Sequence, residues 1–109
     1  MAQSKSDTEN RYQDWLSGFV RLHILHHAAR EPLVGHWMIE ELRRHGYPLS
    51  PGTLYPMLRG MEQKGYLRST GKRSGRRFWR EYRATAAGRK ALAGAKAKLR
   101  ELFSELIEE

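Results

Sequence analysis

The sequence predicts a mainly helical fold that carries one small β-hairpin. Apolar residues recur at helical spacing in four segments of the chain. Between the third and fourth segments the pattern changes to alternation, in two short runs joined by a glycine-flanked basic turn. The length of 109 residues fits one domain, or one small domain with a dimerising extension.

The first two helices are predicted on either side of Pro32. Helical periodicity begins near Tyr12 and must end before Pro32, because a proline cannot continue the hydrogen-bond ladder. We expect residues 1–10 to be flexible. The second helix fits Val34 to His45, and Gly46 is a natural C-terminal stop.

The third helix begins with Ser50 as N-cap and Pro51 at its first position, and it continues to Gly65. Pro56 violates a local rule, because a proline inside a helix removes one hydrogen bond. Either the regular helix starts near Thr53, or its first turn is kinked.

The hairpin consists of two alternating runs, Tyr66 to Thr70 and Phe78 to Ala84, with residues 71–75 as a flexible turn. Thr85 then caps a last helix that reaches about Glu108. Its apolar positions are spaced 3, 4, 3 and 4 residues apart, as in a heptad seam. The seam is formed by Leu92, Ala95, Leu99, Leu102 and Leu106, and Phe103 widens it.

The net charge of +8 is unevenly distributed along the chain. Residues 1–58 carry no net charge, residues 59–83 carry +7, residues 84–100 carry +5 and the last nine carry −4. A basic excess concentrated in one stretch indicates a surface that faces a polyanion.

The predicted order of elements is that of a winged helix-turn-helix: two helices, a short turn, a third helix and a hairpin. A helix fits the major groove of DNA with its N-terminal residues at base edges, and a basic wing contacts the adjacent backbone. The predicted contacts are the start of the third helix and the hairpin tip. They are Ser50, Pro51, Gly52, Thr53, Tyr55, Arg59, Lys72, Arg73, Arg76 and Arg77.

The string Leu49-Ser50-Pro51-Gly52-Thr53-Leu54-Tyr55-Pro56 resembles the PadR family of transcriptional regulators. Leu58, Glu62, Gly65 and Leu67 follow it at the family's distances, as do Gly35 before it and Tyr82-Arg83-Ala84-Thr85 with Gly88 and Arg89 after it. The resemblance covers roughly Leu22 to Leu92 and fits the short members with a single C-terminal helix. It departs from the family at Gly35-His36-Trp37, where Gly-Tyr-Glu is usual, and in a wing about one residue longer.

The resemblance implies two units, a winged helix-turn-helix over residues 1–84 and a dimerisation helix over residues 85–109. It also implies a homodimeric repressor that binds double-stranded operator DNA and releases it when a small molecule binds between the subunits. The aromatic side chains of Trp15, Phe19 and Phe103 are the candidates for that effector pocket. The expected dimer interface comprises Leu16, Val20, His23, His27, Leu92, Ala95, Leu99, Leu102, Phe103 and Leu106.

Two alternatives remain open. His23 and His27 are four residues apart on a helix and adjacent to His26, so a metal-responsive regulator is conceivable. Two imidazoles rarely suffice for a metal, however, and a hydrogen-bonded histidine at the dimer interface is favoured. The basic hairpin could also serve an RNA-binding or protein-interaction module.

Several classes of protein are not expected. The chain has no cysteine, so disulfides and zinc–thiolate sites are excluded. It has no nucleophile elbow, P-loop, dinucleotide turn or HExxH string, so we expect neither an enzyme nor a cofactor. No run of 18 apolar residues and no apolar signal core occur, which predicts a cytoplasmic protein without a membrane partner.

Overall fold

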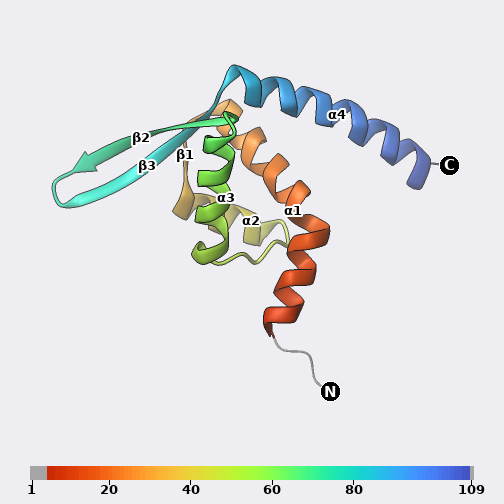
Figure 1. The fold of residues 1–109 in the computed structure, drawn as a ribbon, viewed down its shortest axis with the longest axis horizontal. Helices are drawn as coiled ribbons and strands as arrows, with labels where there is room; N and C mark the ends of the chain where they lie inside the picture. The colour runs from red at the N-terminus through yellow and green to blue at the C-terminus, as the bar shows by residue number, and fades with distance from the viewer. Residues whose placement is uncertain (1–4, 109) are drawn as a thin grey trace.

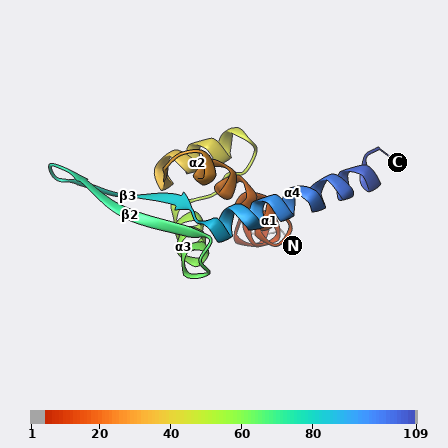
Figure 2. The same ribbon diagram turned by 90° about the horizontal axis from the view of Figure 1, so that it is seen from above.

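A computed structural model describes the backbone of residues 5–108 and the side chains from Leu16 onward. The elements follow in the order α1, β1, α2, α3, β2, β3 and α4. The three helices α1, α2 and α3 form a compact body, from which the β2–β3 wing projects on one side and α4 on the other (Figures 1 and 2). No helix in this part of the chain is long and apolar enough to cross a membrane. The mainly helical fold with a small β-sheet is confirmed.

The first helix, α1, spans Lys5–Arg30 and ends two residues before Pro32, as predicted. Its start lies upstream of Tyr12, so residues 5–10 belong to the helix rather than to the flexible segment that the sequence predicts. Residues 1–4 lie outside the described residues.

The second helix, α2, spans Gly35–Arg44, and Gly46 beyond it has a φ of 88°, which suits a residue without Cβ. A short strand that the sequence does not predict, β1 (Leu33–Val34), precedes α2. Its two residues pair with Tyr82 and Glu81 of β3. Two residues are too few to show alternation, which is why the pattern gives no signal for this strand.

The third helix, α3, spans Pro51–Gln63 with Pro51 in its first turn. Ser50 has the extended backbone of an N-cap, but its hydroxyl donates to the Thr53 hydroxyl at 3.4 Å rather than capping a backbone N–H. Pro56 lies inside the helix, so the alternative of a regular start near Thr53 is wrong.

The wing consists of β2 (Leu67–Ser74) and β3 (Arg77–Ala84), paired antiparallel from Leu67 opposite Ala84 to Ser74 opposite Arg77. The predicted flexible turn over residues 71–75 is therefore wrong, because residues 71–74 continue the ladder. The turn itself is Gly75 and Arg76, and Gly75 has a φ of 62°. A two-residue connection with a positive φ matches the right-handed twist of the strands.

The last helix, α4, spans Ala86–Leu106, two residues short of the predicted end. Thr85 caps it as predicted, since its hydroxyl accepts the Gly88 N–H at 3.0 Å. The same hydroxyl donates to the Gly65 carbonyl, and the Thr85 N–H donates to the Tyr66 carbonyl at 3.1 Å. These bonds join the start of α4 to the turn between α3 and β2.

One hydrophobic core lies between α1, α2, α3, the base of the wing and the first turns of α4. Helices α1, α2 and α3 each contribute fully buried side chains, and α4 contributes Leu92, which is 9% exposed. This core holds α3 with one face inward and the other free. Its largest fully buried members are Ile24, Leu33, Met38, Leu42, Leu54, Leu58, Leu67 and Val20.

Candidate nucleic-acid interface

The outward face of α3 presents most of the predicted helix contacts. Leu54 and Leu58 are fully buried, whereas Ser50 and Arg59 are exposed and Thr53 is half-buried. This division follows from helical spacing, because residues three and four apart share a face. Pro51 and Gly52 are exposed at the start of the helix.

Tyr55 is 38% exposed, and its ring lies against the beginning of α2. A Cβ on Gly35 would lie 2.5 Å from Tyr55 Cε1, so the ring can occupy this place only because residue 35 is glycine. This close approach fixes Tyr55 between the two helices of the helix-turn-helix.

A broad groove of about 1020 Å³ separates α3 and the start of α2 from the wing. Three cationic side chains line it, Arg59 from α3 and Arg77 and Arg80 from β3. Its aromatic lining is Trp37, Tyr55, Phe78, Trp79 and Tyr82. Arginines and aromatic rings in one groove suit a polyanion with flat bases. Trp37, Trp79 and Arg80 are not among the DNA contacts predicted from the sequence, because their convergence depends on the wing's position.

The four predicted wing contacts are all exposed at the end of the hairpin. Lys72 and Arg73 lie at the end of β2, and Arg76 and Arg77 follow across the turn. The Arg77 guanidinium lies 5.9 Å from the centroid of the Trp79 ring, within cation–π range. The tip is far from the α3 start along the projecting wing (Figure 1), so the two sets of contacts would meet separate parts of a ligand.

A polar network joins α3 to the base of the wing. The Glu62 carboxylate accepts the Ser69 backbone N–H at 2.9 Å and the Ser69 hydroxyl at 2.8 Å. The Ser69 hydroxyl in turn accepts a bond from the Arg80 guanidinium at 3.1 Å. Burial, and then the nearby Glu62 carboxylate, raise the pKa of the Tyr82 phenol beside this network. From the sequence, Glu62 is predicted only as part of the motif, and its link to the wing is not.

Comparison with known proteins bears directly on this architecture. The model of the transcriptional regulator PadR-like family matches residues 24–94. The chain belongs to this family. The transcriptional regulator Rv3488 of Mycobacterium tuberculosis is 51% identical to it over 88 residues, which cover 81% of this chain and 82% of that protein.

Solved structures of PadR regulators share the fold. The crystal structure of a PadR family transcriptional regulator from Eggerthella lenta has a TM-score of 0.77 at 27% identity, and the match covers 93% of this chain and 89% of that one. A PadR-like regulator from Bacillus cereus has a TM-score of 0.76 at 24% identity, covering 85% and 92%. This PadR-like protein is therefore a transcriptional regulator of a DNA-binding family and not an enzyme.

The residues predicted for the dimer interface differ in their exposure in this PadR-like chain. Val20 and Leu92 are buried in the chain's own core, and His23 and His27 are half-buried against other residues of the same chain. Leu16, Ala95 and Leu99 are half-buried. The exposed group is Leu102, Phe103 and Leu106 on α4.

The two predicted effector residues with described side chains do not border the groove. Phe19 on α1 is 40% exposed and Phe103 on α4 is 51% exposed, and neither lines the groove. The side chain of Trp15 lies outside the described residues.

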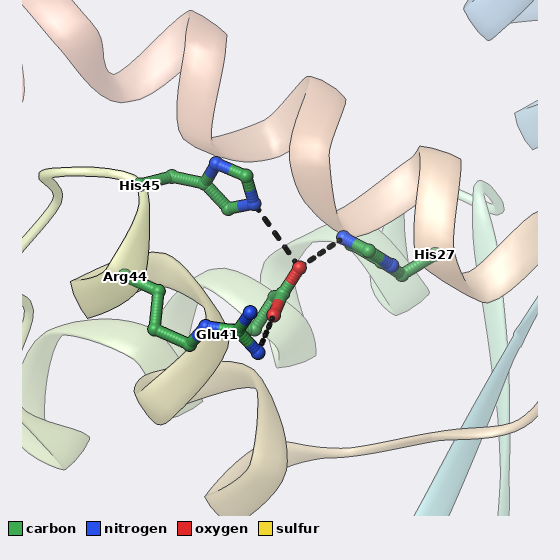
Figure 3. A network of polar contacts seen from close by, with 4 residues as sticks. All are labelled: His27, Glu41, Arg44 and His45. Atoms are coloured by element: carbon green, nitrogen blue, oxygen red, sulfur yellow. Dashed lines mark hydrogen bonds and ion pairs between the residues drawn. The ribbon is translucent and has the colours of Figure 1, made fainter.

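His27 of α1 and His45, directly after α2, both contact Glu41 of α2 (Figure 3). His27 Nε2 lies 3.4 Å and His45 Nε2 lies 3.1 Å from the same Glu41 oxygen. Burial, with His45 and His26 nearby, lowers the pKa of His23; burial also lowers the pKa of His27, although Glu41 opposes it. In the part of the chain with described side chains, no three His, Asp or Glu residues are arranged to hold a metal ion. The metal-responsive alternative therefore gains no support from this geometry.

Proposed function

We propose that this PadR-like regulator is a homodimeric, sequence-specific repressor that a small-molecule effector releases from its operator. The observation that carries DNA recognition is the exposure of two chemically different surfaces, from which Arg59 of α3 and Arg77 of β3 line one groove. The first surface consists of Ser50, Thr53 and Arg59, at the start and on the outer face of α3. The second consists of the wing-tip cations Lys72, Arg73, Arg76 and Arg77. Operator binding would place the protein in the cytoplasm, as the sequence predicts.

The two surfaces divide the work of binding between them. Ser50, Thr53 and Arg59 are suited to base edges in the major groove, where hydroxyl groups and guanidinium carry sequence information. Arg76 and Arg77 are suited to phosphates, which contribute affinity but no sequence information directly. Replacing a cation on the wing and a side chain on α3 should therefore have different consequences.

The test uses a duplex selected by the protein from a random library and a scrambled duplex of the same length. Arg76→Ala and Arg77→Ala should weaken binding to both duplexes, and each should reduce the slope of log K against log salt by about 1. Arg59→Ala should cost about 1–3 kcal/mol on the selected duplex alone. Lys98→Ala removes an exposed cation from α4 and should change neither affinity.

Equal affinity of the wild-type protein for the two duplexes would refute sequence-specific recognition. Retained binding to RNA, or to a protein partner, together with failure to enrich any duplex, would favour the interaction-module alternative.

The second element of the proposal is a dimer formed through α4. Beyond Leu92 none of the described α4 side chains is buried, yet Leu102, Phe103 and Leu106 are 45–67% exposed, and Ile107 directly after the helix is 68% exposed. An apolar row of this kind on a projecting helix (Figure 2) favours burial against a second copy. A dimer would present two copies of α3 to a pseudo-palindromic operator.

Leu102→Glu should convert the dimer into a monomer in sedimentation velocity, because a buried carboxylate has no partner there. Ala97→Glu introduces the same side chain away from the apolar row and should leave the dimer intact. A Leu102→Glu protein that still sediments as a dimer would exclude this surface as the interface.

Release by an effector is the third element, and it rests on family resemblance. Phenolic acids and hydrophobic drugs, added singly to the protein on its selected duplex, should include one that lowers affinity in a saturable manner. If no such compound is found and repression in a reporter strain is constant, the proposal reduces to an unregulated repressor.

A further inference from the structure

The outer half of the wing has no support from a third strand. β1 pairs only with Tyr82 and Glu81, which lie near the base of β3. Residues 71–78 are all exposed, so no described side chain of the tip is held in a core. The direction in which the tip points must therefore be determined at the base of the wing.

The Glu62 network is located at that base and touches both strands. Glu62 comes from α3, Ser69 from β2 and Arg80 from β3. Glu62 accepts two bonds from Ser69, one of them from the backbone N–H, so the attachment constrains the strand itself and not only a side chain. Arg80 joins the second strand to the same point through the Ser69 hydroxyl.

The negative charge of Glu62 should, by itself, weaken the binding of DNA. Among the described residues that line the groove, it is the one carboxylate, beside Arg59, Arg77 and Arg80. A negative charge in a groove that receives DNA opposes the phosphates. On charge alone, neutralising Glu62 should tighten DNA binding.

We propose that Glu62 is a positioning residue for DNA recognition: through Ser69 and Arg80 it fixes the wing at one angle to α3, so that tip cations and helix side chains engage DNA in one register. This inference rests on the proposed function. Ser69 is five residues from Ser74 along the strand, which corresponds to about 16 Å. A rotation of about 15° at Ser69 would move the tip by about 4 Å, far more than a hydrogen bond to phosphate tolerates.

The experiment compares Glu62→Ala with Glu81→Ala. Both substitutions raise the net charge by one, but Glu81 accepts its bond from Trp79 within the wing and makes no described link to α3. Glu62→Ala removes both bonds from Ser69, and it should weaken binding to the selected duplex about tenfold and leave the scrambled duplex unchanged or slightly tighter. Glu81→Ala should leave both nearly unchanged. Ser69→Ala should have an intermediate effect, because the bond from its backbone N–H remains.

A second measurement reports on the wing without DNA. Backbone ¹⁵N relaxation should show lower order parameters at residues 71–78 in Glu62→Ala than in the wild type, while the Glu81→Ala control stays at wild-type values. Unchanged amide shifts for the core residues would show that the fold is intact.

The results separate the inference from the function on which it rests. If the wild type binds both duplexes equally, the proposed function fails, and the order parameters alone then show whether Glu62 fixes the wing. If the wild type discriminates but Glu62→Ala binds the selected duplex as tightly as the wild type or more tightly, the positioning role is refuted. Unchanged order parameters in Glu62→Ala would refute it as well.

Discussion

Gly88 and Gly94 lie on the same helix and should respond in opposite ways to alanine. Gly88 is buried at the start of α4, where a Cβ would lie 2.2 Å from the Tyr66 carbonyl oxygen and 3.2 Å from Leu25 Cδ2. The carbonyl cannot simply turn away, because it accepts the Thr85 N–H at 3.1 Å. Gly94 is exposed, and a Cβ there would meet nothing within 4 Å.

The magnitudes follow from these two environments. Replacing a helical glycine by alanine stabilises a helix by about 1 kcal/mol, and this gain applies at both positions. At Gly88 the gain is outweighed by overpacking, which costs about 3 kcal/mol where backbone must shift. We therefore expect Gly88→Ala to destabilise the protein by about 2 kcal/mol and Gly94→Ala to stabilise it by about 1 kcal/mol.

Urea unfolding followed by circular dichroism measures both changes, with protein concentration held constant because stability of a dimer depends on it. With a slope of about 2 kcal/mol per molar urea, the two midpoints should differ by about 1.5 M. Equal midpoints, or a Gly88→Ala protein more stable than the wild type, would show that α4 and the Tyr66 carbonyl are not in close contact.

Two further predictions concern the cap and the histidines. Thr85→Ala should lower the free energy of unfolding by about 2 kcal/mol, because the hydroxyl both caps α4 and donates to the Gly65 carbonyl. Thr85→Ser keeps the hydroxyl and should lower it much less. Urea unfolding in which the Ser variant is as unstable as the Ala variant would contradict this. Since burial lowers the pKa of His23 and His27 from 6.5, the unfolded chain binds more protons, so stability should be complete above pH 6.5 and fall as the pH drops below it. Replacing both histidines by Gln should reduce this loss of stability at low pH. If the urea midpoint of the double variant depends on pH as that of the wild type does, other groups cause the loss.

The helices could be predicted from the sequence because each has a local signal. Pro32 ends α1, Gly46 follows α2, and the Thr85 hydroxyl caps α4. The inward face of α3 follows from the spacing of Leu54 and Leu58, and this spacing also predicts which side chains point outward.

Features that depend on tertiary contact could not be predicted in the same way. The extent of the wing strands depends on the pairing of residues 71–74 with β3, which polar and glycine residues do not signal. Glu62 occupies a helix position that any solvated acid could occupy. Its role depends on the Ser69 backbone N–H, which lies beyond the turn after α3 and donates to the Glu62 carboxylate at 2.9 Å. Likewise, Val20 and His27 face their own chain because α1 packs on α2, β3 and α4, although a single helix face suits a partner subunit equally well.

The bonds of Thr85 have a mechanical consequence. They join the turn that follows α3, the exit of β3 and the first turn of α4 at one junction, so the direction of α4 is coupled to the position of α3. If two chains associate through α4, as proposed above, the angle between the two α4 helices determines the separation of the two copies of α3. A ligand that changes this angle would change which half-site spacing the pair can span, without touching a single residue at the DNA surface.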